Sequence, residues 1–315
     1  MIPLRVIFMG TAELACASLE ALSKAPAFQV VAVVTQPDKP KGRDLKLQPS
    51  AVKQLALQLN LPVLQPEKAR SHDFVATLGK LMPDIIVVVA YGQILPQTIL
   101  DLPRLGCLNL HTSLLPKYRG AAPIQWAILD GEAETGVTIM KMDAGLDTGD
   151  ILSQTATPIQ PSDTSQTLHH RLAILGAELL VETIPHFAVG TIAPKKQPDG
   201  SNYARKISKE DGRINWSDPA RKLWNQVRAF TPWPGAFTFQ QKENERCLLK
   251  IWEAEMVEAP SGEPGKILRA DKSGIVVGCG ANALRILTMQ REGGRRLSAQ
   301  EFLAGNPIQT GEKFS

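Results

Sequence analysis

Short apolar runs alternate with helix-like segments along the first half of the chain. Residues 85–89 are an unbroken series of β-branched side chains, which is typical of a parallel strand that is covered on both faces. Between such runs, apolar residues recur every three or four positions, as on one face of a helix. This alternation predicts an α/β domain with a mainly parallel sheet. The expected strands are 4–9, 28–35, 62–64, 84–90 and 105–110, and the expected helices are 12–24, 50–60, 71–81, 122–129 and 163–189.

The pattern changes in the last third of the chain. Residues 191–209 lack periodicity and contain Pro194, Pro198 and Gly200, which is typical of a linker. The strand-like segments that follow are short and are separated by Gly and Pro, which predicts a small β-barrel. These segments are 236–240, 248–255, 265–270, 274–278 and 283–290. We therefore expect an N-terminal domain over 1–190, a linker over 191–209 and a C-terminal barrel domain over 210–315.

Composition limits the number of domains and the kinds of partner, but it does not indicate a function. The 315 residues suffice for two domains, and a hydrophobic fraction of 43% with a charged fraction of 21% is ordinary for a globular protein. A net charge of +4 allows a nucleic-acid partner without arguing for one. The longest apolar run, 85–90, is far too short to cross a bilayer, so no membrane partner is expected.

The sequence lacks the motifs of cysteine-based zinc or redox sites and those of nucleotide-binding loops, which disfavours both kinds of protein. The cysteines Cys16, Cys107, Cys247 and Cys279 are far apart, and without Cys-x-x-Cys spacing neither a zinc site nor a thioredoxin-type motif is expected. Reduced cysteines fit a cytoplasmic protein. The turn at Gly10 lacks the other glycines of dinucleotide and P-loop signatures, so we reject both assignments.

Two polar clusters lie at the end of apolar segments, the first on the predicted strand 105–110 and the second after the apolar segment 137–142. Asn109 and His111 are two residues apart, so a strand would present both on the same face. Downstream, the acidic and glycine-rich segment 143–150 contains Asp147. An amide donor, an imidazole and a carboxylate at neighbouring loops of one sheet would suit a reaction that generates an oxyanion. Taken singly, each cluster also has a plain structural explanation, namely a packed histidine and simple turn chemistry.

Longer motifs around these clusters resemble the 10-formyltetrahydrofolate-dependent formyltransferase family. The chain is similar over its whole length to the methionyl-tRNA formyltransferases of that family, which implies a Rossmann-like catalytic domain and an OB-like barrel that binds tRNA. The motifs that carry the resemblance are 35–40, 89–92, 109–116, 118–125, 134–140, 142–150 and 230–235. The chain departs from the family pattern at Ala12 and Thr112, and neither departure removes a functional group.

The resemblance implies a mechanism for the polar clusters. In the family, the methionyl α-amino group attacks the formyl carbon of 10-formyltetrahydrofolate, and the folate N10 leaves. Asn109 and His111 would stabilise the oxyanion, while Asp147 would orient His111 and accept the amine proton. Because the formyl group arrives activated, no metal is expected. By the same resemblance, the folate would be bound by Ser113, Leu114, Leu115, Pro116, Val89, Tyr91 and Gly92.

Three functions remain open at this point. The acceptor of the formyl group is methionyl initiator tRNA, or it is a small amine such as a nucleotide-sugar or glycinamide ribonucleotide; alternatively, the chain is a non-catalytic RNA-binding module. The basic loop 36–49 favours tRNA, because phosphates dominate the affinity for RNA and a small acceptor needs no such loop. Its expected tRNA-binding residues are Lys39, Lys41, Arg43 and Lys46, and Lys195, Lys196, Arg205, Lys206, Arg291, Arg295 and Arg296 would extend the same track.

Overall fold

The structure is a computed structural model that describes residues 2–41, 46–242, 245–259 and 263–315. The chain divides into two compact units that interleave in sequence. The first unit contains Met1–Pro123, Glu134–Pro158 and His169–Ala204, and the second contains Ile124–Ala133, Ile159–Leu168 and Arg205–Ser315. Each unit is described by itself below.

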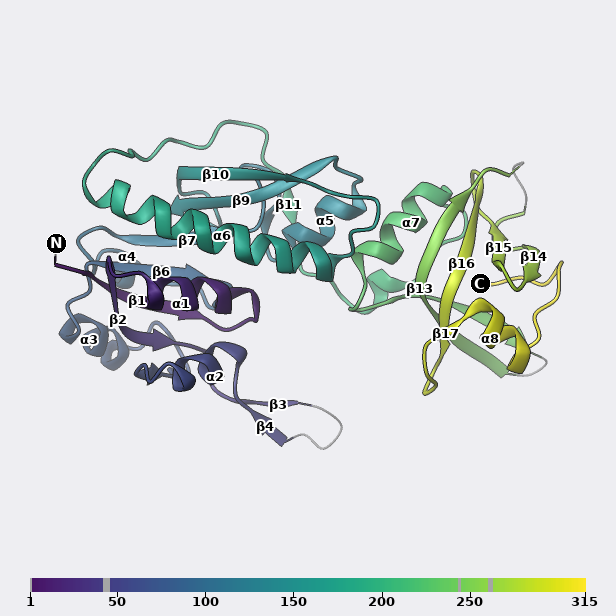
Figure 1. The fold of residues 1–315 in the computed structure, drawn as a ribbon, viewed down its shortest axis with the longest axis horizontal. Coiled ribbons are helices and arrows are strands. Elements are labelled where there is room, and N and C mark those ends of the chain that lie inside the picture. Colours follow the sequence, from purple (N-terminus) through teal and green to yellow (C-terminus); the bar gives the residue numbers. More distant parts are fainter. Residues whose placement is uncertain (1, 42–45, 243–244, 260–262) are drawn as a thin grey trace. The chain divides into compact units, whose positions relative to one another are not determined.

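A seven-stranded sheet forms the centre of the first unit within the described residues. Its strands are β1 (Leu4–Gly10), β2 (Phe28–Val34), β5 (Val63–Leu64), β6 (Ile85–Val89), β7 (Cys107–His111), β9 (Glu134–Lys141) and β10 (Asp150–Pro158). Their order is β10-β9-β7-β6-β1-β2-β5 (Figure 1). The strands from β7 to β5 are parallel, β9 pairs antiparallel with β7, and β10 pairs antiparallel with β9 at the edge. The predicted α/β class with a mainly parallel sheet is confirmed.

Helices cover both faces of this sheet. They are α1 (Leu14–Lys24), α2 (Ala51–Gln58), α3 (His72–Lys80), α4 (Gln97–Leu100) and most of α6 (Ser165–Ala188), whereas α5 (Pro123–Leu129) belongs almost entirely to the second unit. On one face, Met9 of β1 and Val88 of β6 belong to the same buried cluster as Leu78 of α3 and Ile99 of α4. On the other, α6 approaches β7 so closely that a Cβ at Gly176 would lie 2.6 Å from Leu110. Figure 1 shows α1 and α6 in front of the strands.

Two parts of the first unit differ from the sequence-based expectation. The segment 36–49, predicted to be a polar loop, contains a short hairpin of β3 (Lys39–Lys41) and β4 (Lys46–Gln48). No strand was predicted at β10, in which only Leu152 and Thr157 are buried, beside the buried β9. An edge strand with one exposed face needs few apolar residues, so β10 has no apolar run that would reveal it.

The second unit is built around an antiparallel sheet with the order β12-β13-β16-β15-β14. Its elements are η1 (Glu210–Gly212), α7 (Ala220–Ala229), β12 (Ala236–Lys242), β13 (Glu245–Val257), β14 (Ile267–Asp271), β15 (Gly274–Gly278), β16 (Ala283–Arg291), β17 (Leu297–Ser298) and α8 (Ala299–Gly305). The C-terminal residues join the two edges of this sheet, since Ser315 exchanges backbone hydrogen bonds with Phe239 next to Phe314, whose N–H donates to Gly265. The predicted small barrel is confirmed, and its core includes Trp216, Leu223, Ile251, Ile286 and Phe302.

None of the helices in the described part of the chain is long and apolar enough to cross a membrane.

Candidate active site

A cavity of about 620 Å³ lies at the carboxyl ends of β6 and β7. This edge of a parallel sheet is where α/β folds bind their ligands, and the volume suits a small-molecule site. Its walls are mostly apolar. The lining residues include Val88, Tyr91, Gly92, Ile94, Leu95, Asn109, His111, Met140, Met142, Asp147 and Tyr203.

Strand β7 presents Asn109 and His111 to this cavity. The two residues flank Leu110, whose side chain packs against α6 on the opposite face of the sheet. Alternation along the strand therefore places both polar side chains on the cavity side, as the sequence predicted. Asn109 is half-buried and His111 is 6% exposed, so the imidazole is largely shielded from water while it faces the cavity.

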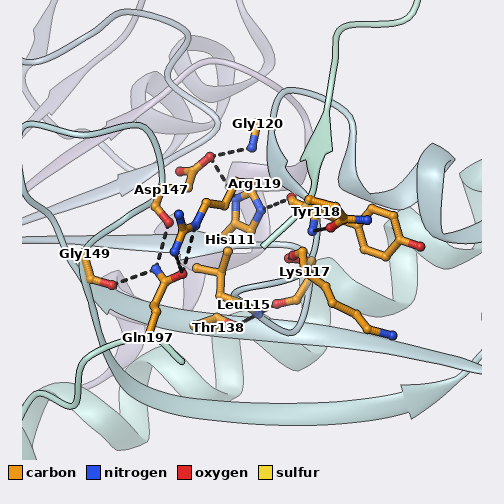
Figure 2. A network of polar contacts seen from close by, with 12 residues as sticks. His111, Leu115, Lys117, Tyr118, Arg119, Gly120, Thr138, Asp147, Gly149 and Gln197 are labelled. Atoms are coloured by element: carbon orange, nitrogen blue, oxygen red, sulfur yellow. Dashed lines mark hydrogen bonds and ion pairs between the residues drawn. The ribbon is translucent and has the colours of Figure 1, made fainter. Parts of the chain in front are cut away.

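The imidazole of His111 has a different partner on each nitrogen (Figure 2). Its Nε2 lies 2.8 Å from the carbonyl oxygen of Tyr118. A carbonyl oxygen can only accept a hydrogen bond, so Nε2 carries a proton. Its Nδ1 lies 3.8 Å from Oδ2 of Asp147, which is the distance of an ion pair when the ring is protonated. Nδ1 is therefore the ring atom that is available to exchange a proton.

Asp147 is held in place by the backbone around it. Its Oδ2 accepts a hydrogen bond of 2.8 Å from the backbone N–H of Gly120. Asp147 has a φ of 52° and Tyr118 a φ of 60°, so both residues that contact the His111 ring adopt the left-handed conformation. Non-glycine residues stay in this region only when the surrounding structure holds them there, and such positions concentrate at functional sites.

The segment 113–116 is ordered by buried and part-buried hydrogen bonds to β9 and β10. The hydroxyl of Thr138 donates to the Ser113 carbonyl at 2.7 Å and accepts from the Leu115 N–H at 3.1 Å. The side-chain amide of Gln154 donates to Thr138 and to the Leu115 carbonyl. Ser113 and Leu115 are buried. This segment thus has a well-determined conformation next to the strand that carries Asn109 and His111.

The structure brings some of the predicted site residues together and leaves others apart. Asn109, His111, Asp147, Tyr91 and Gly92 all line the cavity. Among the described residues, the lining set does not include the following predicted folate contacts: Val89, Ser113, Leu114, Leu115 and Pro116. Val89 is fully buried within the sheet, because β6 is covered on both faces. The binding roles of all these residues stay predictions.

Three of the predicted tRNA contacts, Lys39, Lys41 and Lys46, belong to the strands of the β3–β4 hairpin. Lys39 begins β3 and donates a hydrogen bond to the side chain of Gln36, Lys41 ends β3, and Lys46 begins β4. Arg43 lies outside the described residues. The contacts of these cations with RNA stay predictions.

Sequence reasoning missed the groups that fasten the His111–Asp147 pair. The Tyr118 carbonyl and the Gly120 N–H are backbone atoms, so no residue type reveals them. The side chain of Gln197 donates to the carbonyls of Asp147 and Gly149, both at 2.8 Å. Gln197 was overlooked because it lies in a segment rich in Pro and Gly that was interpreted as a linker.

The described residues offer neither a cluster of metal ligands nor, at Cys107 and Cys279, a reactive thiol. Within them, no group of three or more His, Cys, Asp or Glu side chains could hold a metal ion. All four cysteines are free thiols. Burial raises the pKa of Cys107 to about 12 and that of Cys279 to about 11, which keeps both protonated. A buried thiol of this kind serves packing rather than nucleophilic attack. The expectation of a metal-free reaction stays a prediction.

Comparisons with known proteins place the chain in a family. The family model described as formyl transferase matches residues 4–184, and the model described as formyl transferase, C-terminal domain, matches residues 206–307. The methionyl-tRNA formyltransferase of Geobacter metallireducens is 50% identical over 312 residues, covering 99% of this chain and 98% of its own length. That of Aromatoleum aromaticum is 51% identical over 313 residues, covering 99% and 97%.

A solved structure shares the fold at lower sequence similarity. The N-formyltransferase of Helicobacter canadensis, in complex with folinic acid and dTDP-3-aminofucose, superimposes with a TM-score of 0.64 at 22% identity, covering 92% of this chain and 100% of that one. At this identity the likeness concerns the fold alone, whereas the two family models together with relatives at about 50% identity confirm the resemblance stated from the motifs. The chain therefore belongs to the formyl transferase family.

Proposed function

We propose that this protein transfers the formyl group of 10-formyltetrahydrofolate to the α-amino group of methionyl initiator tRNA. The observation that carries the proposal is a full-length match of about 50% identity to methionyl-tRNA formyltransferases, combined with a cavity that holds Asn109, His111 and Asp147 side by side. The products are N-formylmethionyl-tRNA, which serves translation initiation, and tetrahydrofolate.

The reaction forms one C–N bond and breaks another. The amine nitrogen attacks the formyl carbon, and the carbonyl oxygen takes up negative charge in a tetrahedral intermediate. When this collapses, the bond to the folate N10 breaks, N10 gains a proton, and the former amine loses one. Hydrogen-bond donors aimed at the developing oxyanion lower the barrier most when they are fixed beforehand. Asn109, held on the rigid strand β7, is the donor that we assign to this task.

We assign proton transfer during the reaction to His111 and Asp147. Because the Tyr118 carbonyl fixes the proton on Nε2, only Nδ1 of His111 can accept or donate one during the reaction. Protonated Nδ1 is stabilised by Asp147 at 3.8 Å and can in turn stabilise the oxyanion. Among the residues that the structure describes, the other oxygen of the carboxylate has no hydrogen-bond partner, since Oδ2 is the atom that accepts from Gly120. We assign that oxygen to the incoming ammonium group, whose proton must leave before attack.

The folate is assigned to the apolar part of the cavity. Val88, Ile94, Leu95 and Met140 provide walls for a flat ring system, and polar anchors are few, as in most small-molecule sites. Support for a folate ligand also comes from the formyltransferase of Helicobacter canadensis, which shares the fold and whose structure contains folinic acid.

The acceptor distinguishes this proposal from its alternative. Purified protein is incubated with 10-formyltetrahydrofolate and either methionyl initiator tRNA, glycinamide ribonucleotide or a nucleotide-linked aminosugar, and the formylated product is quantified. We expect kcat/KM for the tRNA to exceed that for either small amine by several orders of magnitude. The Asn109→Ala variant is the control, because it should lose about a hundredfold to a thousandfold in turnover while it still binds tRNA. Preferential formylation of a small amine would contradict the proposal.

A further inference from the structure

Residues 195–204 run back along the first unit and contact both loops that hold His111, namely the loop with Tyr118 and the loop with Asp147. We call them the return segment. At its start, Lys195 exchanges backbone hydrogen bonds of 2.7 and 2.9 Å with Ile151 of β10. At its end, β11 (Tyr203–Ala204) pairs in parallel with β8 (Arg119–Gly120). The segment is therefore fastened to the first unit at both ends, although its Pro- and Gly-rich sequence predicts a linker.

The return segment lies against the loop that contains Tyr118 and Gly120. Asn202 accepts the backbone N–H of Tyr118 with its side chain and that of Arg119 with its carbonyl, the latter at 3.1 Å. Gly120 has a φ of +112°, and a Cβ at this position would lie 2.7 Å from the Ala204 carbonyl oxygen. Only glycine allows this approach, so the backbone N–H that binds Asp147 is placed partly by the return segment.

Gln197 makes the corresponding contact with the Asp147 loop. Its side-chain NH₂ donates to the carbonyls of Asp147 and Gly149, both at 2.8 Å. Its Oε1 accepts from Nε and Nη2 of Arg119 at 3.0 and 2.7 Å. The amide thus uses both donors and its acceptor, and this identifies which atom is oxygen, because carbonyls and a guanidinium cannot exchange roles (Figure 2). Gln197 is half-buried, whereas its neighbours Lys196 and Pro198 are exposed.

We propose that Gln197, oriented by Arg119, is a positioning residue that holds Asp147 at His111. The left-handed backbone of Asp147 needs outside support, and two hydrogen bonds from Gln197 at Asp147 and Gly149 supply it. Arg119 fixes the amide orientation, so the donors point at the loop before substrate arrives. Gln197 itself is not among the described residues that line the cavity, so it acts through Asp147 and not on the substrate. This inference rests on the proposed formyl transfer.

Two substitutions distinguish the effect of losing the Gln197 amide donors from the effect of losing the whole side chain. Gln197→Glu keeps an acceptor for Arg119 but replaces both donors with a carboxylate oxygen facing two carbonyls, whereas Gln197→Ala removes all four hydrogen bonds. Asp199→Asn is the matched control, since Asp199 is an exposed residue of the same segment. We expect kcat to fall about tenfold to a hundredfold in both Gln197 variants, because a misplacement of about 1 Å costs that much, with KM changing less than threefold. Asp199→Asn should keep wild-type kcat.

A double-mutant cycle tests whether Gln197 acts through Asp147. In an Asp147→Asn background, Gln197→Ala should lower kcat less than threefold further, because the group that it positions is already disabled. A full additional loss would overturn the proposal, as would a kcat within twofold of wild type in both single variants.

Amide hydrogen exchange gives a readout that does not depend on activity. The Gly120 N–H is protected by Asp147, so its exchange should accelerate at least tenfold in Gln197→Ala and stay unchanged in Asp199→Asn. Unchanged protection of Gly120 in the folded variant would overturn the proposal. An inactive wild-type protein with accelerated exchange in the variant would instead refute the proposed function and leave the positioning role supported.

Discussion

The two ring nitrogens of His111 are used differently, and this decides what the residue can do. Nε2 is tied to a backbone carbonyl, so the ring cannot rotate without losing a buried hydrogen bond. Nδ1 faces Asp147, and His111 lines the cavity. An imidazole with one nitrogen anchored and the other facing a carboxylate is oriented before substrate arrives, and such an arrangement can lower a barrier without reorganisation.

At the scale of single residues, His111 and Asp147 should behave as one unit. We expect His111→Ala and Asp147→Asn each to lower kcat by about a hundredfold to ten-thousandfold, the usual contribution of a proton-transfer group. The double variant should be little worse than the poorer single variant, because each group works through the other. Steady-state kinetics on the four proteins measure this, with thermal unfolding as a check that all are folded. Losses that multiply in the double variant would show that the residues act independently.

At the scale of elements, β7 and its loops are positioned by partners that are distant in sequence. Thr138 of β9 and Gln154 of β10 fix the segment 113–116, and the 195–204 return segment fixes the loop after it. The edge strand β10 therefore contributes to the site, since the side chain of Gln154 holds the backbone of the segment 113–116.

Strands and helices with apolar periodicity could be predicted from the sequence, and elements defined by polar contacts could not. The strands β1, β6 and β7 are revealed by apolar runs, and Asn109 and His111 by their spacing on one of them. The hairpin β3–β4, the strand β10 and the docking of Gln197 depend on partners far along the chain, which leave no local pattern. Sequence therefore indicated the polar side chains that line the cavity, but not the backbone atoms and amide that hold them.

Thr138 offers a test at this scale. Thr138→Val keeps the shape of a fully buried side chain but leaves the Ser113 carbonyl and the Leu115 N–H without their partner. We expect the free energy of unfolding to fall by about 1–3 kcal/mol, the usual cost of burying unpaired polar groups. Thr183→Val is the matched control, since Thr183 is equally buried and shares a single hydroxyl contact with Ser153. Urea unfolding compares the two, and an equal or larger loss in Thr183→Val would contradict the importance of the Thr138 contacts.

At the scale of the whole molecule, each unit has its own core, and the second carries cations stacked on aromatic rings. The guanidinium of Arg246 lies 3.7 Å from the ring centre of Phe239, and that of Arg296 lies 3.6 Å from that of Trp252. Stacking fixes the plane of a guanidinium while its N–H edge stays available, which suits phosphate binding. Arg285 differs, because it is paired with Glu255 at 2.6 Å. The barrel therefore provides two kinds of arginine with the same charge, those stacked on an aromatic ring and one paired with a carboxylate.

This contrast predicts how formylation depends on salt. Each phosphate contact releases counterions, so the slope of log kcat/KM against log salt concentration measures how many contacts a variant has lost. We expect Arg246→Gln and Arg296→Gln each to reduce the steepness of this slope by about one for methionyl-tRNA, with KM for the folate unchanged. Arg285→Gln removes the same charge from a position already neutralised by Glu255, and its slope should match that of the wild type. Steady-state kinetics over a salt series measure all four slopes. If Arg285→Gln changes the slope as much as the stacked arginines do, the effect reflects net charge alone, and the stacked arginines are not phosphate contacts.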